Sequence, residues 1–341
     1  MADRRPLVAI VGSPSLLGRE LREVLAERRL PASIKLIGAE DEDTITLTEH
    51  AGEPVVMTSL DEESLSEAQV VVLAGSRASS RKVAQMLERT GSAAALLDLT
   101  ASYEDSPRAR LRAPMLEPPG FRAPAATIHV VAHPAAIALA LLLTQLSRRH
   151  ALRNAVAHVF EPASERGREG VEELKEQTVS LLTFKGLPKR VFDEQLGFNL
   201  LIRYGSSAPE ALEEVEQRIE RHLVSLLAIA DGPAPPSLRL IQAPVFHGHS
   251  FSVWVEFEQD PDPLELEKTL ARPEFDVRGR GTEAPNAVGF AGQSGVAVGA
   301  IEADRNNPRA AWFWMVADNL RLAAENAVEV LAQIVGSESA T

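Results

Sequence analysis

The sequence LVAIVGSPSLLG at residues 7–18 decides the fold. Its first five residues are apolar, which is typical of a strand buried in a parallel sheet. A turn that contains Gly12 and Gly18 follows, and the spacing of Leu21 and Leu25 then predicts a helix. A buried strand, a glycine-containing turn and a helix in this order indicate the first unit of a nucleotide-binding fold.

Further apolar runs at residues 34–37, 70–74 and 93–97 alternate with amphipathic or loop segments. This rhythm is typical of βαβ units and a parallel sheet. Residues 1–130 are therefore expected to form a doubly wound, Rossmann-like domain. A loop that contains proline and arginine is expected to end this region at residues 106–125.

The next segment, residues 128–143, is the most membrane-like part of the chain. Its uninterrupted apolar run covers only residues 135–143, well short of the roughly 20 residues that span a bilayer. We expect a buried strand, a turn and a buried helix here, and no contact with a membrane. The charged residues at 1–6 lack the apolar core of a signal peptide, so a cytoplasmic protein is expected.

The second half changes character and predicts an α+β domain with a more antiparallel sheet. A proline-rich break at residues 231–236 separates the second of its helices from the next strand. The expected strands are 156–160, 237–242, 251–257 and 312–316, and the expected helices are 170–182, 209–230 and 318–335.

Length, charge and cysteine content limit the function. The 341 residues suggest two domains at about 150 residues each. The net charge of −13 argues against a general nucleic-acid or anionic membrane surface. The chain contains no cysteine, which excludes a thiol nucleophile, disulfides and thiolate metal sites.

Two later segments resemble the aspartate-semialdehyde dehydrogenase family. These are APVFHGHS at residues 243–250, which precedes the alternating strand at 251–257, and VADNLR at residues 316–321. Three further segments fit the same family in the same order, and the resemblance covers nearly the whole chain. They are residues 8–18, residues 70–76 (VVVLAGS) and residues 195–200 (QLGFNL).

The resemblance implies two domains and a dimer. An N-terminal Rossmann domain, residues 1–130, would be completed by residues 318–341, and an α+β domain at residues 131–317 would pair two subunits and hold the catalytic groups. In the family a cysteine attacks the aldehyde carbon, a histidine acts as general base, NADP accepts the hydride and phosphate resolves the thioester. A homodimer is therefore expected.

The nucleophile is missing. The family's cysteine segment falls on AHPAAIA at residues 132–138, with Ala136 at the nucleophile position. A methyl group cannot attack a carbonyl, and the chain contains no cysteine at any position. The sequence therefore predicts that the family reaction by the family mechanism is lost.

The anion-binding positions are also altered. The family's cationic substrate-binding residues fall on Glu104, Glu213 and Gln242, so two acids and an amide replace them. An acid facing an anionic acyl phosphate is repulsive, and weak binding of the family's substrate is expected.

The resemblance places a dinucleotide at the glycine turn. Pro14 in that turn has no N–H to donate, so the turn either binds a dinucleotide weakly or is only structural. The acidic residues 40–43 after the second strand favour a ribose hydroxyl over a 2′-phosphate, hence NAD over NADP. The implied cofactor positions are Gly12, Ser13, Ser15, Leu16, Leu17, Gly18, Glu40, Gly75, Ser76 and Asn319.

His249 falls on the family's catalytic histidine and has three interpretations. It is retained only because its turn packs well, or it exchanges protons with Glu161, which occupies the position of the family's substrate-orienting glutamine. A metal site with His133 and His247 has suitable ligand types, but no ligand spacing supports it, and no metal is expected.

Other conspicuous residues have structural interpretations. Trp312 and Trp314 share one face of a strand, which indicates a core or a subunit interface. The acidic residues from Glu210 to Glu220, with Arg218 and Arg221, are expected on a solvated helix face.

The leading hypothesis is a dimeric scaffold or regulatory paralogue without the family activity, including a mixed dimer with an active paralogue. The alternative is an NAD(P)-linked oxidoreductase with an altered substrate, in which His249 and Glu161 transfer protons.

Overall fold

The computed structural model describes residues 5–39, 46–121 and 128–338. The chain divides into two compact units. The first unit comprises Met1–Ala132 and Ala323–Thr341, and the second comprises His133–Leu322.

The first unit contains a sheet of eight strands within the described residues, in the order β3-β4-β2-β1-β5-β6-β8-β7. All neighbouring strands are parallel except the pair β3 and β4. The strands are β1 (Leu7–Val11), β2 (Ser33–Ile37), β3 (Thr46–His50), β4 (Glu53–Thr58), β5 (Val70–Leu73), β6 (Ala95–Asp98), β7 (Ala109–Arg112) and β8 (Ile128–Val131). The helices between them are α1 (Leu16–Arg28), α2 (Glu62–Leu65) and α3 (Arg77–Thr90).

Both faces of this sheet are covered, as in a doubly wound fold. Val8 and Ile10 of β1 pack in one cluster with residues of α1 and of the C-terminal helix α8 (Asn319–Glu338). Ala9 and Val11 point to the other face and pack with residues of α3. The alternation along β1 therefore confirms the predicted Rossmann-like sheet, and the last helix returns to it.

The predicted loop at residues 106–125 is wrong in part, because it contains β7. This strand has the sequence ARLR and pairs in parallel with β8. Arg112 is buried, and its guanidinium forms two hydrogen bonds with Glu117. A buried arginine with a carboxylate partner can occupy a strand, but it does not produce the apolar pattern that identifies one.

The second unit has a six-stranded mixed sheet in its described part, in the order β10-β9-β11-β14-β13-β12. The prediction of a more antiparallel sheet holds for β11, which is antiparallel to β9 and β14, but β10 is parallel to β9 and β12 to β13. The strands are β9 (Leu152–Glu161), β10 (Ser237–Gln242), β11 (His249–Phe257), β12 (Phe275–Arg278), β13 (Val296–Ala303) and β14 (Ala310–Ala317).

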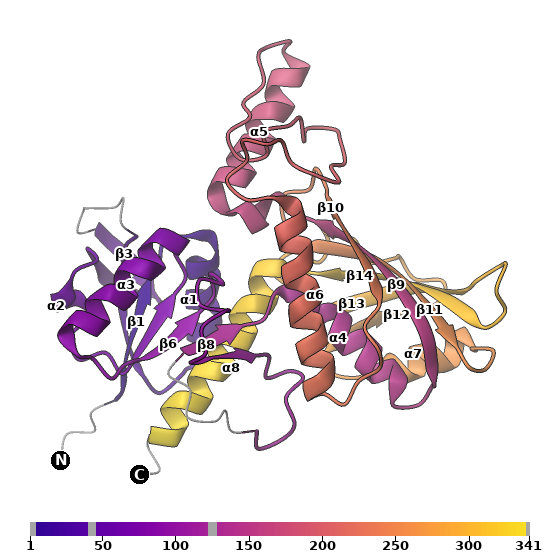
Figure 1. The fold of residues 1–341 in the computed structure, drawn as a ribbon, viewed down its shortest axis with the longest axis horizontal. Helices are drawn as coiled ribbons and strands as arrows, with labels where there is room; N and C mark the ends of the chain where they lie inside the picture. The colour runs from indigo at the N-terminus through magenta and orange to yellow at the C-terminus, as the bar shows by residue number, and fades with distance from the viewer. Residues whose placement is uncertain (1–4, 40–45, 122–127, 339–341) are drawn as a thin grey trace. The chain divides into compact units, whose positions relative to one another are not determined.

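Helices pack against this sheet (Figure 1). Helix α4 (Pro134–Ser147) contacts β9 and β14, and it is buried from Pro134 to Leu146, as expected for this apolar segment. Helices α6 (Leu212–Ile229) and α7 (Pro263–Leu270) pack beside α4. Among the described residues, no helix has the length and apolar character to cross a membrane.

A helical arm, α5 (Gly167–Leu182), follows the one-turn helix η1 (Ala163–Arg166). Two buried polar side chains of α5 form hydrogen bonds with the segment that follows it. Glu173 accepts hydrogen bonds from the amides of residues 190–192, and Gln177 bonds the backbone at Pro188 and at residues 194–197. These side chains satisfy several backbone polar groups of this irregular segment.

Candidate functional site

Three polar side chains lie at one level across three neighbouring strands. Gln242 of β10 is paired with Glu161 of β9. Ser250 of β11 is paired with Phe160, so His249 stands beside Glu161. All three side chains are fully buried and point to the face that carries Val159. The register of the sheet thus brings together two positions predicted for the catalytic site and one predicted for substrate binding.

The N-terminus of α4 lies against this group. His133 caps the helix, because its Nδ1 accepts the N–H of Ala135 at 3.2 Å, and its ring centroid is 5.7 Å from that of His249. The backbone N–H of His133 donates to His222 Nδ1 at 3.0 Å. Ala136, at the nucleophile position, is the third residue of the helix and is fully buried. A thiol at this place would lie near the positive end of a helix, but the chain supplies a methyl group.

Glu165 of η1 stands between the two histidines. Its Oε1 lies 3.8 Å from His249 Nε2, and its Oε2 lies 3.6 Å from His133 Nε2. The amide of Asn319 donates a hydrogen bond to Oε1 at 3.0 Å. We call His133, Glu161, Glu165 and His249 the His249 cluster.

Asn319 holds the backbone around this cluster. Its Oδ1 accepts hydrogen bonds from Ser164 Oγ at 3.1 Å and from the N–H of Gly248 at 3.0 Å. The structure therefore gives Asn319, a predicted cofactor position, hydrogen bonds that join η1 to the turn before His249. Its role in cofactor binding stays a prediction.

Arg166 places its positively charged side chain beside Glu161. Its guanidinium donates to one oxygen of Glu161, to Glu210 and to the hydroxyl of Tyr204. Arg218 donates to the other oxygen of Glu210 at 2.7 Å. Two arginines and two carboxylates thus form one buried ion-pair network at the sheet end.

Burial sets the protonation of the cluster. It lowers the pKa of His249 to about 3, with a further contribution from the charge of Arg166, and it lowers the pKa of His133 well below its usual range. Both histidines are therefore neutral at pH 7. Burial also raises the pKa of Glu165 to about 7, and the nearby charge of Glu161 adds to this effect.

The structure corrects the predicted solvated face of α6. Arg218 is buried, and Glu210 precedes the helix and belongs to the ion-pair network. Glu213 is exposed, and its carboxylate accepts a hydrogen bond from Gln217 at 3.5 Å. Of the predicted substrate-binding positions, Gln242 therefore lies in the site, and Glu213 does not join the polar group around His249.

Sequence reasoning missed Glu165 and Arg166. The signal was present, because two adjacent charged residues follow the buried end of β9 by only a few positions. No family motif pointed to them. Tyr204 was missed as well, and it donates from its hydroxyl to the side-chain oxygen of Gln242.

The described residues contain no group of three or more histidine, cysteine, aspartate or glutamate side chains arranged to hold a metal ion. The hydrogen bonding of His133 agrees with this, since an Nδ1 that accepts a hydrogen bond leaves the proton of a neutral ring on Nε2. That proton occupies the nitrogen nearest Glu165.

In the first unit, the glycine turn forms a tight contact between β1 and β5. A Cβ on Gly12 would lie 2.3 Å from the backbone of Gly75. The N–H groups of Gly12 and Ser13 both donate to the carbonyl of Ile37 at 3.1 Å, so these two amides already have partners. Ser15 caps α1 by accepting the N–H of Gly18 at 2.9 Å.

The remaining predicted positions of this unit have varied places. Leu16 and Leu17 are the first two residues of α1, and Ser76 caps α3. Glu104 is half-buried. Glu40 lies outside the described residues, and so does the rest of the acidic run at 40–43. Cofactor binding at these positions stays a prediction.

Comparison with known proteins gives consistent relatives. Residues 149–322 match the family model described as semialdehyde dehydrogenase, dimerisation domain. A USG-1 protein homolog from Pseudomonas aeruginosa is 31% identical over 94% of this chain and 95% of its own length. A solved structure of a probable aspartate-semialdehyde dehydrogenase from Pseudomonas aeruginosa has a TM-score of 0.83, at 27% identity, and covers 98% of both chains.

A more distant structure has the same fold. The aspartate semialdehyde dehydrogenase of Candida albicans, whose structure is described as solved with NADP, has a TM-score of 0.67 at 14% identity. It covers 98% of this chain and 99% of its own.

Proposed function

The chain belongs to the aspartate-semialdehyde dehydrogenase family, and we propose that it is a homodimeric member that does not catalyse the family's thiol-dependent reaction. Ala136 carries this proposal, because it occupies the nucleophile position at the start of α4 in a chain without cysteine. No covalent thioester can form there. The function proposed is that of a dimeric scaffold or regulatory paralogue.

The rest of the site supports the same conclusion. The side chain of Gln242, at a position where the family has an arginine, donates to the carbonyls of Glu161 and Ala243. Glu161 is itself bound to Arg166. An anionic substrate would therefore meet groups that are already paired within the protein, beside additional carboxylates. No observation favours the alternative in which His249 and Glu161 serve a different oxidoreductase reaction.

An activity assay tests the loss of the reaction. Incubation of the purified protein with aspartate semialdehyde, phosphate and NADP is expected to form NADPH at least about 10⁴-fold more slowly than an active family enzyme assayed beside it, because the nucleophile is absent. The readout is absorbance of NADPH. The Ala136→Cys variant restores a thiol at this buried position, but its NADPH formation is still expected to remain slow, since the anion-binding positions remain altered.

Phosphate-dependent NADPH formation by the unaltered protein at a rate near that of the active enzyme contradicts the proposal.

Calorimetric titration of the same preparation with NADP, and separately with NAD, tests the cofactor site. Weak dinucleotide binding is proposed, with the N–H groups of Leu16 and Leu17 at the start of α1 as donors to phosphate. A dinucleotide bound there would supply a hydride acceptor. The preference for NAD has no support beyond the sequence argument at residues 40–43.

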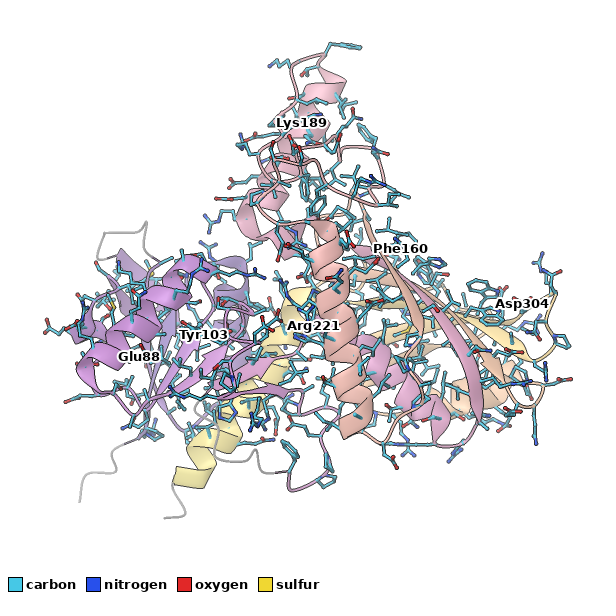
Figure 2. The ribbon with its side chains drawn as sticks, viewed as in Figure 1. Glu88, Tyr103, Phe160, Lys189, Arg221 and Asp304 are labelled. Carbon is cyan, nitrogen blue, oxygen red and sulfur yellow. The ribbon has the colours of Figure 1, made fainter. Side chains whose placement is uncertain are left out.

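A sheet face in the second unit supports the homodimer. Trp254 and Trp312 are paired across β11 and β14, and the Nε1–H of each donates to Asp304 Oδ2 at 2.9 Å. Asp304 and Phe160 are labelled in Figure 2. Trp312 is 39% exposed. Phe160 and Trp314 lie on the same face, 6.1 Å apart between ring centroids. Aromatic side chains on a half-buried face are typical of subunit interfaces.

The oligomeric state tests this proposal. The molar mass in solution is expected to be about twice 36.9 kDa. Trp312→Arg is expected to weaken the dimer at least about tenfold, because it places a charge among aromatic side chains. Leu264→Arg on α7 changes an apolar residue that is more exposed, at 55%, and is expected to leave the mass unchanged. Analytical ultracentrifugation is the measurement.

A monomer at all concentrations, or a Trp312→Arg dimer as tight as the original, contradicts the proposed interface. A mixed dimer with an active paralogue is the finer form of the proposal. Co-expression with the active enzyme of the same organism tests it, and recovery of homodimers alone would falsify it.

A further inference from the structure

Large apolar side chains are exposed at the C-terminal end of the helical arm α5, which projects from the sheet of its unit (Figure 1). Val179 and Leu182 are 51% and 68% exposed, and Phe184, two residues after the helix, is 98% exposed. We call these three residues the arm patch. The opposite face of α5 is held by the buried Glu173 and Gln177, which bind the segment that follows. Exposed apolar side chains gathered in one place indicate a surface that another molecule covers.

A groove lies beside the arm patch. It has a volume of about 650 Å³ and lies between α5 and residues 185–188, which turn back along the helix. Its α5 wall includes Val179, and its other wall includes Leu187 and Pro188. Gln177 holds this second wall, because its side-chain amide donates to the carbonyl of Pro188 at 2.8 Å. The arm therefore presents an exposed aromatic ring and, next to it, a preformed recess.

The charges on the arm are arranged about Val179. Glu172 lies seven residues before Val179 on the same face of the helix, and Lys185 lies six residues after it. Both side chains are exposed, and among the described residues neither has an ion-pair partner. The neighbouring Glu176 is already paired with Arg190 at 2.8 Å. The arm thus carries an unpaired carboxylate on one side of its patch and an unpaired ammonium group on the other.

An antiparallel pair of such helices is self-complementary. A two-fold axis at Val179 places Glu172 of each copy opposite the partner's Lys185, because both positions lie about 10 Å from Val179 at about 1.5 Å per residue. Phe184 lies five residues after Val179, so the same axis brings its ring to the level of the groove in the other copy. One symmetric contact therefore covers the exposed ring, fills the groove and pairs both charges.

A second copy fits this surface better than a partner of uniform charge. An anionic lipid surface attracts Lys185 but repels Glu172, and a cationic surface does the reverse. Only a partner with both signs, in the opposite order along its length, meets both ends of the arm favourably. The arm of another copy has that order when it runs antiparallel.

We propose that the arm patch is a self-association surface at which the α5 helices of two copies pack antiparallel about Val179, each Phe184 in the groove of the other copy. This contact uses residues other than those of the aromatic sheet face, so it joins two dimers into a tetramer. A contact between two single helices is small, and its dissociation constant is expected on the order of 100 µM. The proposal goes beyond the loss of the family reaction and does not depend on it.

Sedimentation of the full-length protein between about 1 µM and about 300 µM tests the proposal. We expect dimers at the low end and tetramers at the high end. Val179→Glu is expected to weaken tetramer formation at least about tenfold, because the two-fold axis sets the new carboxylates against each other. Val224→Glu on α6 adds the same charge at a valine of nearly equal exposure, 50%, and is expected to associate like the unaltered protein. Thermal unfolding checks that both variants are folded.

A charge exchange tests the pairing itself. Glu172→Lys and Lys185→Glu are each expected to weaken the tetramer about tenfold, because by symmetry each substitution creates two pairs of like charge. The double variant restores opposite charges and is expected to associate within about threefold of the unaltered protein. High salt is expected to reduce the effect of each single substitution, since exposed charges are screened.

Three results overturn the proposal. They are the absence of any species larger than a dimer at about 300 µM, an effect of Val224→Glu as large as that of Val179→Glu, and no recovery of association in the double variant. A fourth is dissociation of the dimer into monomers by Phe184→Ser at about 1 µM, because the arm patch then belongs to the dimer contact.

The Trp312→Arg variant separates this contact from the proposed dimer. It is expected to be a monomer at low concentration and to pair through its arms at high concentration. Failure of the sheet contact therefore still allows the arm contact to be measured. Failure of the arm contact changes neither the NADPH assay nor the effect of Trp312→Arg on the dimer.

Discussion

Replacement of Arg166 by alanine is expected to lower the free energy of unfolding by about 3 kcal/mol, because it leaves buried carboxylates without their cation. The Glu161 side chain is fully buried, and the Arg166 side chain is 12% exposed. The substitution also removes the guanidinium that lies 5.7 Å from the ring centroid of Tyr204. Urea unfolding followed by circular dichroism measures the change as a lower midpoint.

A matched control exists on the surface of the same unit. Arg190 donates to Glu176 at 2.8 Å, but both side chains are more than half exposed. Arg190→Ala is therefore expected to leave the urea midpoint nearly unchanged. An equal loss in the two variants would show that the Arg166 network contributes no more than an exposed pair.

The pH dependence of the Arg166 variant checks the mechanism. The charge of Arg166 lowers the pKa of Glu161 against the effect of burial, so its removal raises that pKa further above the unfolded value. A raised carboxyl pKa gives stability that is present at low pH and lost as the pH rises. The difference in midpoint from the unaltered protein is thus expected to be larger at about pH 8 than at about pH 5. A constant difference contradicts this account.

The fold was largely predictable where one local pattern repeats. The apolar run of β1 and the spacing along α1 predicted the first βα unit, because both periodicities lie within one short segment. β7 was not predictable in this way. Its inward Arg112 is acceptable because its guanidinium has several polar partners: Glu117 nearby in the chain, and His129 and Gln333 through tertiary contacts.

The candidate site was predictable only in part for the same reason. His249, Glu161 and Gln242 were identified through the family resemblance, but their meeting depends on the pairing of three strands. Glu165 and Arg166 have no family motif, and their importance follows from where η1 places them. The partners of a buried charge come from distant segments, so composition and spacing alone assigned Arg218 to a solvated face.

Retention of the glycine turn has a packing reason that is independent of any cofactor. Gly12 has a φ of +79°, and a Cβ there would lie 2.3 Å from both Cα and N of Gly75, which are backbone atoms that cannot move aside. Gly12→Ala is therefore expected to lower the free energy of unfolding by about 3 to 5 kcal/mol, from overpacking and from the strained backbone together. Thermal unfolding measured without any nucleotide detects it.

Gly52 supplies the control for the backbone contribution alone. Its φ of +80° is nearly the same, but a Cβ there would meet no atom within 4 Å. Gly52→Ala is expected to cost only about 1 kcal/mol, from the backbone conformation. If Gly12→Ala is no worse than Gly52→Ala, close packing of β1 against β5 does not explain the glycine. If the large difference is found, Gly12 stabilises the packing of β1 against β5 whether or not a dinucleotide binds.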